Sequence, residues 1–169
     1  MKLYRPHDKF TRILFSIALI FIVFSLVIIS KIPPADGYEF SIYDVYPWYF
    51  WFFIIMSLLI GQLIIIKSAV SENESNSWVF GFITILVTDA ILLLLPIIRG
   101  YLIYGRGDVL THIGYAKDIL NSGHISPSNI YPIEHILAVT IHGITNIGLG
   151  TLTIAIPAIL FLLFVFWYA

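Results

Sequence analysis

The stretch Ile13–Ser30, ILFSIALIFIVFSLVIIS, is almost entirely apolar and contains no charged residue. A helix needs about 20 mostly apolar residues to cross the hydrocarbon core of a bilayer, so this stretch is long enough to be a membrane span. It is too long for the apolar part of a signal peptide, and no small-residue cleavage site follows it. We therefore interpret it as a retained transmembrane helix.

Three further stretches have the same character. They are Trp48–Ile66, which opens with an aromatic cluster, Trp78–Ile98, which contains the single charge of Asp89, and Gly150–Ala169 at the end of the chain. The whole sequence is 59% hydrophobic and 11% charged, with a mean hydropathy of +0.94, whereas soluble domains carry about 25% charged residues. These features predict an all-α membrane protein with about four transmembrane helices.

A shorter segment, residues 134–148, is apolar but studded with polar side chains such as Glu134, His135 and His142. Short helices of this kind more often lie at the membrane surface than cross it. We therefore predict amphipathic juxtamembrane helices here, with five transmembrane helices as the alternative.

The four cations before the first span predict a cytoplasmic N-terminus. This gives a cytoplasmic segment 1–12, a three-helix transmembrane region 13–98, an external loop 99–149 with juxtamembrane helices, and a terminal transmembrane helix 150–169. The sequence thus predicts a multi-pass protein of the cell membrane, and because it stops within its last span we expect a truncated chain.

Charge and cysteine content exclude several classes of function. The net charge is −1 and the cations are scattered, so no nucleic acid is expected as a partner. The absence of cysteine excludes disulfides and thiolate ligands. Within the spans, a carboxylate such as Asp89 costs about 2.5 to 3.5 kcal/mol to insert. We expect it to face the helix bundle and to bond a neighbour such as Thr84, Thr88 or Gln62.

The external loop holds most of the polar chemistry. The apolar positions Val109, Ile113, Ala116 and Leu120 recur with the period of a helix lying along the membrane, and Asn121–Gly123 predicts its end. Asp108 and His112 are four residues apart, so their side chains should share one helix face. Asp108 is either a helix cap, or a general base or metal-binding carboxylate; His112 is either a simple hydrogen-bonding residue, or a proton carrier or metal ligand.

The pattern R-G-D-x-x-x-H-x-x-x-A-x-x-I-L-x-S-G-x-I-x-P-x-x-x-Y-P-x-x-H-x-L-A, residues 106–138, resembles the first large external loop of GT-C-type polytopic membrane glycosyltransferases. This superfamily includes protein mannosyltransferases, aminoarabinose transferases of lipid A and the catalytic subunit of oligosaccharyltransferase. The resemblance extends from Arg99 to the C-terminus. It implies sugar transfer from a polyprenyl-phosphate donor on the external membrane face, by an N-terminal fragment that lacks the rest of its cavity.

The resemblance also assigns roles to individual residues. Asp108 matches the catalytic aspartate of the family's loop, which acts as a base or holds a divalent metal. The substrate-binding residues that it implies are Arg106, for the donor phosphate, together with His112, Tyr131, Glu134 and His135. The expected partners are the lipid bilayer, a lipid-linked sugar and a membrane protein that completes the bundle.

Two other classes of function stand beside this one. The first is a small non-enzymatic multi-pass subunit whose external loop docks a companion protein. The second is a transporter or channel, which is weakened because the spans contain few polar residues beyond Asp89.

Overall fold

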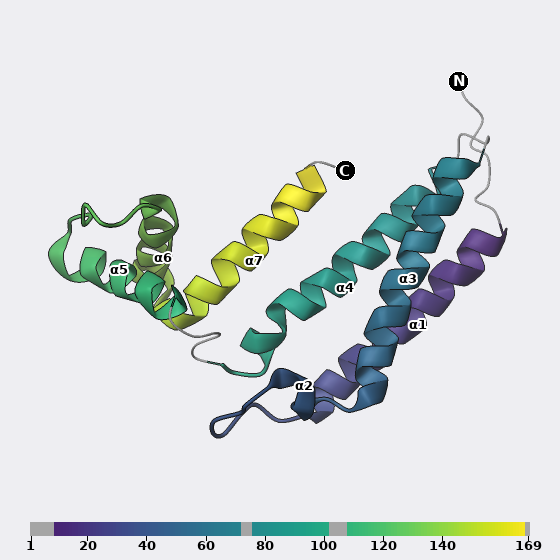
Figure 1. Cartoon of the computed structure of the whole chain (residues 1–169), viewed down its shortest axis with the longest axis horizontal. Helices are drawn as coiled ribbons and strands as arrows, with labels where there is room; N and C mark the ends of the chain where they lie inside the picture. The colour runs from purple at the N-terminus through teal and green to yellow at the C-terminus, as the bar shows by residue number, and fades with distance from the viewer. Residues whose placement is uncertain (1–8, 72–75, 102–107, 168–169) are drawn as a thin grey trace. The chain divides into compact units, whose positions relative to one another are not determined.

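The computed structural model describes residues 9–71, 76–101 and 108–167, and the regular structure in these ranges is entirely helical (Figure 1). The helices are α1 (Lys9–Lys31), α2 (Ile42–Val45), α3 (Trp48–Val70), α4 (Trp78–Ile98), α5 (Asp108–Ser122), α6 (Pro132–Thr145) and α7 (Leu149–Trp167). The chain forms two compact units, residues 1–92 and 93–169, whose boundary falls within α4.

Four of these helices, α1, α3, α4 and α7, are long and apolar enough to cross a membrane. The predicted all-α membrane fold with about four spans is therefore confirmed. The 14 residues of α6 extend only about 21 Å at 1.5 Å per residue, which is less than the roughly 30 Å of a hydrocarbon core. The helix count thus favours four spans over the five-span alternative.

In the first unit, α1 and α3 pack against each other along positions that recur every three or four residues. Buried positions on these helices include Ala18, Ile22, Ser25 and Ile29 on α1, and Phe50, Ile54, Ser57, Ile60 and Ile64 on α3, and among them Ala18, Ile60 and Ile64 form one cluster. Such spacing is typical of helices that pack at a shallow crossing angle. Lys67, near the end of α3, lies 4.6 Å from the ring centroid of Phe10, near the start of α1. The two helices are therefore antiparallel.

A pair of glycines brings α3 and α4 into close contact. A Cβ atom at Gly81 would lie 2.5 Å from the carbonyl oxygen of Gly61, and one at Gly61 would lie 3.0 Å from the carbonyl oxygen of Gly81. Small residues let two membrane helices approach this closely and gain van der Waals contact. Phe15 and Phe80, whose ring centroids are 4.8 Å apart, extend the packing from α1 to α4.

Several hydroxyl side chains within the spans bond to carbonyls of their own helices. The hydroxyls of Thr84 and Thr88 donate to the carbonyls of Phe80 and Thr84, respectively. Each threonine hydroxyl has a single proton, so neither donates to Asp89. Asp89 is half-buried, and Gln62 is exposed on α3.

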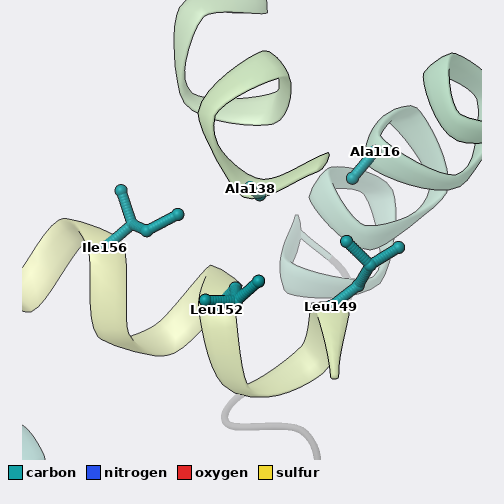
Figure 2. Packing of buried hydrophobic residues seen from close by; sticks show 5 residues of the cluster. All are labelled: Ala116, Ala138, Leu149, Leu152 and Ile156. Carbon is teal, nitrogen blue, oxygen red and sulfur yellow. The ribbon is translucent and has the colours of Figure 1, made fainter. Parts of the chain in front are cut away.

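The second unit has its core where α5 and α6 meet the first turns of α7. Figure 2 shows this cluster, which consists of Ala116, Ala138, Leu149, Leu152 and Ile156. Alanines at the meeting point of α5 and α6 allow their backbones to approach α7, and the larger side chains of α7 fill the space between them. In the second unit, α5 and α6 therefore pack on the start of α7, which is long and apolar enough to cross a membrane.

Residues in the left-handed backbone conformation follow the ends of α4, α5 and α6. Gly100 (φ 81°) follows α4, Gly123 (φ 69°) follows α5, and Asn146 (φ 58°) caps α6. The predicted stop of α5 at Gly123 is confirmed, because glycine enters this conformation without the steric penalty of a Cβ atom. Of the predicted apolar stripe on α5, Ile113 and Ala116 are buried, whereas Leu120, close to the helix end, is exposed.

Candidate functional site

The predicted carboxylate Asp108 is the first residue of α5. Its side chain is 88% exposed, and its Oδ2 lies 3.6 Å from Nε2 of His112, which is 27% exposed. The first turn of a helix favours negative charge because the unpaired backbone N–H groups there carry partial positive charge. Asp108 is thus an accessible carboxylate with an imidazole one turn away, as their spacing predicts.

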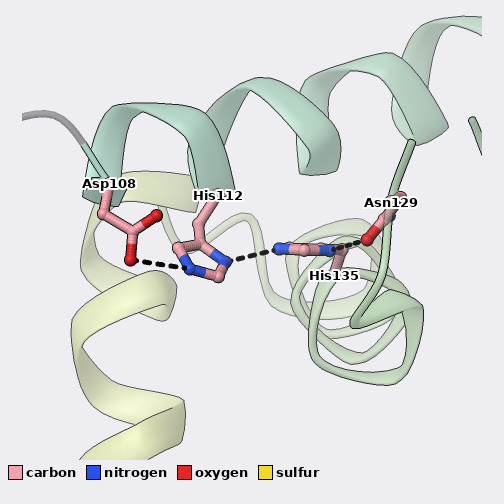
Figure 3. Close-up of polar contacts among 4 residues, drawn as sticks. All are labelled: Asp108, His112, Asn129 and His135. Carbon is pink, nitrogen blue, oxygen red and sulfur yellow. Dashed lines mark hydrogen bonds and ion pairs between the residues drawn. The ribbon is translucent and has the colours of Figure 1, made fainter.

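The other ring nitrogen of His112 contacts a second histidine on the neighbouring helix. Its Nδ1 lies 2.8 Å from Nε2 of His135, which is in α6. The two rings are tilted, with centroids 5.0 Å apart. His112 therefore lies between Asp108 on one side and His135 on the other (Figure 3).

An asparagine completes this arrangement. Nδ1 of His135 lies 2.8 Å from Oδ1 of Asn129, in the connector between α5 and α6. Figure 3 shows the four side chains in sequence, and we refer to Asp108, His112, His135 and Asn129 as the polar chain. The polar chain begins at the exposed carboxylate of Asp108 and ends at two buried residues. His135 is 1% exposed and Asn129 is 7% exposed.

The connector is fixed by a tight turn just before Asn129. The backbone N–H of Asn129 donates to the carbonyl of Ser126 at 2.9 Å, and Pro127 occupies the second position of this turn, where its fixed φ angle is favourable. The hydroxyl of Tyr115 on α5 donates to the carbonyl of Ser128 at 3.0 Å. These bonds hold the connector against α5 and place Asn129 beside His135.

Burial changes the acid–base behaviour of His135. Its pKa is lowered, first because burial disfavours the charged ring, and second because of the charge of His112. The negative charge of Glu134, the next residue, acts in the opposite direction but more weakly. His135 is therefore biased toward the neutral form, in which one ring nitrogen donates and the other accepts.

The remaining predicted site residues lie outside the polar chain. Tyr131 is exposed at the start of α6. Glu134 is half-buried in the first turn of α6 and influences His135 through its charge. Arg106 lies outside the described residues, as do residues 1–8 of the predicted cytoplasmic segment.

The donor set does not fit a resident divalent metal. Within residues 9–71, 76–101 and 108–167, no group of three or more His, Asp or Glu side chains could hold an ion. The two facing histidine nitrogens are occupied by each other at hydrogen-bonding distance. Within the described residues, the polar chain is thus held together by contacts between its own side chains.

Sequence reasoning did not identify Asn129 or Tyr115 as part of the site. The only available signal for Asn129 was its position in a Ser-Pro-Ser-Asn turn shortly before the Tyr-Pro element and His135. A turn with proline at its second position has a defined exit direction, which fixes where the following side chain points.

The polar chain contains groups that can accept, donate and share protons. An exposed carboxylate can accept a proton from a bound hydroxyl, and the histidines behind it can stabilise or share the charge. Comparison of the chain with models of protein families, with curated proteins and with solved structures finds no match.

Proposed function

We propose that the second unit carries part of the active site of a membrane glycosyltransferase, in which Asp108 is the general base. The observation that supports this most directly is the polar chain: an exposed carboxylate that meets an imidazole held by a second, buried histidine. The resemblance of residues 106–138 to a GT-C external loop supports the same assignment and suggests a polyprenyl-phosphate sugar as the donor.

In the proposed reaction, the acceptor hydroxyl oxygen forms a bond to the anomeric carbon of the sugar. The bond between that carbon and the phosphate oxygen breaks, and its electron pair leaves with the polyprenyl phosphate. The hydroxyl proton passes to the carboxylate of Asp108, which lies at ion-pair distance from His112. No step is assigned to a metal.

The position of the site suits a lipid-linked donor. The helices that carry the polar chain, α5 and α6, pack on the first turns of α7, which is long and apolar enough to cross a membrane. A polyprenyl tail in the bilayer would place its phosphate near the headgroups, at the level where α7 begins. Arg106, two positions before Asp108, could pair with that phosphate.

One observation favours the alternative of a non-enzymatic subunit. Ile130, Tyr131 and Ile133 are all highly exposed around the start of α6. Exposed apolar side chains gathered in one short segment often mark a protein or membrane contact. We rank this alternative second because it gives no reason for the polar chain.

A turnover assay tests the proposal. The protein, reconstituted in lipid nanodiscs with labelled polyprenyl-phosphate sugars and a panel of hydroxyl acceptors, should release labelled product. Asp108→Asn should lower the rate by about 10²- to 10⁴-fold, the usual contribution of a general base. Asp118→Asn is the matched control, since Asp118 is an exposed carboxylate later on the same helix.

The two variants separate catalysis from folding and surface charge. Both should retain the helical circular dichroism of the wild type, and Asp118→Asn should retain its turnover. Equal turnover by the two variants would contradict the role of Asp108. Absence of turnover by the wild type with every donor and acceptor in the panel would favour the non-enzymatic subunit.

A further inference from the structure

We propose that His135 and Asn129 are positioning residues that keep an N–H group of His112 directed at Asp108. The kinetic consequence of this inference rests on the proposed function, but the proton positions themselves do not. The inference follows from counting the protons that the distances in the polar chain allow. Each buried nitrogen or oxygen in such a chain needs a donor or an acceptor opposite it, because no water replaces a missing partner.

The first arrangement has the amide oxygen of Asn129 facing His135. Oδ1 can only accept, so Nδ1 of His135 carries a proton and donates it at 2.8 Å. If His135 is neutral, its Nε2 accepts a hydrogen bond from Nδ1–H of His112. Nε2 of His112 then faces the carboxylate of Asp108 at 3.6 Å. That contact is favourable when Nε2 is also protonated, so that His112 is a cation paired with Asp108.

The second arrangement has the amide of Asn129 turned by half a rotation. Its nitrogen then donates to Nδ1 of His135, so His135 carries its proton on Nε2 and donates it to Nδ1 of His112. His112 in turn carries its proton on Nε2, directed at Asp108. Both histidines are neutral in this state. Without this rotation, Nδ2 of Asn129 is buried and has no hydrogen-bond partner among the described residues. The rotation pairs Nδ2 with Nδ1 of His135.

A third arrangement is disfavoured by electrostatics. With both histidines neutral and protonated only on Nδ1, the bare Nε2 lone pair of His112 would face the negative charge of Asp108. The two favourable arrangements therefore share one feature, an Nε2–H group of His112 pointing at Asp108. The first arrangement has one proton more than the second, and the amide of Asn129 turns when this proton is taken up. Asparagine suits both arrangements because its amide can present either a donor or an acceptor.

The surroundings disfavour the additional proton on His135. His135 is biased toward neutrality by burial and by the neighbouring ring, with Glu134 as the opposing charge. The other titratable or charged groups of α5, α6 and their connector are Tyr115, Lys117, Asp118, His124, Tyr131 and His142. The segment of α7 that packs against them, Leu149–Trp167, contributes none.

The decisive experiment reads proton positions by nitrogen NMR of the full-length protein with ¹⁵N-labelled histidine in nanodiscs. Variants with glutamine at His124 or His142 assist the assignment. At about pH 8, above the ordinary histidine pKa of about 6.5, His112 and His135 should each carry the proton on Nε2 alone. A wild-type His112 that is protonated on Nδ1 alone would overturn the inference, and this measurement requires no change within the polar chain.

Asn129→Asp tests the role of the amide. An aspartate can only accept, so the proton of neutral His135 should move from Nε2 to Nδ1, and the titration midpoint of His135 should shift upward because the charged ring gains a carboxylate partner. Asn121→Asp, an exposed change at the end of α5, should leave both unchanged. Unaltered proton positions in folded Asn129→Asp would also overturn the inference.

The pH profile of turnover separates this inference from the proposed function. If Asp108 is the base and the polar chain positions it, Asn129→Ala should change the pH dependence of the rate, beyond any uniform loss. An unchanged profile would overturn the positioning role while leaving Asp108 as the base. No turnover in the wild type would overturn the proposed function, and the NMR measurements would still decide the proton positions.

Discussion

At the scale of single residues, His135 should make the second unit sensitive to acid. Its pKa in the folded protein lies below the ordinary histidine value of about 6.5. As the pH falls below that value, the unfolded chain binds a proton that folded His135 does not. The free energy of unfolding should therefore decrease with falling pH until the pH passes the folded pKa, and it should be unaffected by His135 above about pH 6.5.

The measurement is hydrogen exchange of α6 amides between about pH 7.5 and 5, a range that brackets the ordinary histidine pKa, with each rate corrected for the intrinsic effect of pH. Protection should fall on acidification in the wild type and in His124→Gln, whose side chain is exposed. The decrease should be smaller in His135→Asn. Protection that increases on acidification would contradict the assignment of His135 as a buried, neutral residue.

Only part of the polar chain can be predicted from the sequence. Asp108 and His112 follow from helical spacing, because side chains four residues apart share a face. The contact between His112 and His135 depends on how α6 returns against α5, which the turn after Ser126 determines. The same turn ends at Asn129, so the local sequence indicates the turn, whereas the contact of Asn129 with His135 depends on the packing of α6 against α5.

At the scale of elements, the contact between α3 and α4 should be the most sensitive to added volume. In Gly81→Ala the new methyl group would lie 2.5 Å from a backbone oxygen and 3.1 Å from the Cβ of Ile64. Neither neighbour can rotate away, so we expect a loss of about 1 to 3 kcal/mol. Gly114→Ala, in α5 where a Cβ would meet nothing within 4 Å, should instead gain about 0.5 to 1 kcal/mol.

Unfolding of the two variants in mixed micelles with increasing denaturing detergent, followed by circular dichroism, compares them directly. Since both add one methyl group to a helical glycine, intrinsic helix propensity favours both equally. Any difference in sign therefore reports the helix contact alone. Stabilisation by Gly81→Ala would show that α3 and α4 can separate without cost.

The helices themselves follow closely from apolar run lengths, whereas their pairing does not. The predicted spans agree with α1, α3, α4 and α7. In lipid, a single continuous apolar segment can pair all of its backbone N–H and C=O groups internally only by forming a helix. The four-residue α2, capped by Ser41, lies between two of the predicted spans, where no helix is predicted from the sequence. The approach of Gly61 to Gly81 requires knowledge of helix rotation, which nearly uniform apolar composition leaves undetermined.

At the scale of the whole molecule, composition determines the class of protein and the number of crossings determines which loops share a side. Four crossings, by α1, α3, α4 and α7, place the connector around Asn76 on the side of the N-terminus. They place the whole segment from α5 to the start of α7 on the opposite side. The N-terminal cations favour the cytoplasm for the first of these sides, so we predict that the polar chain is external.

This arrangement can be tested with single cysteines, because the sequence contains none of its own. Ile125→Cys lies before α6 and Gly148→Cys after it, and both positions are exposed. In intact cells a membrane-impermeant maleimide should label both, because α6 is too short to cross the bilayer. Asn76→Cys, also exposed, should be labelled only after the cells are permeabilised. If intact cells label Ile125→Cys but not Gly148→Cys, then α6 crosses the membrane. If intact cells label only Asn76→Cys, then the polar chain lies on the cytoplasmic side. In that case a sugar donor presented on the external face could not reach Asp108.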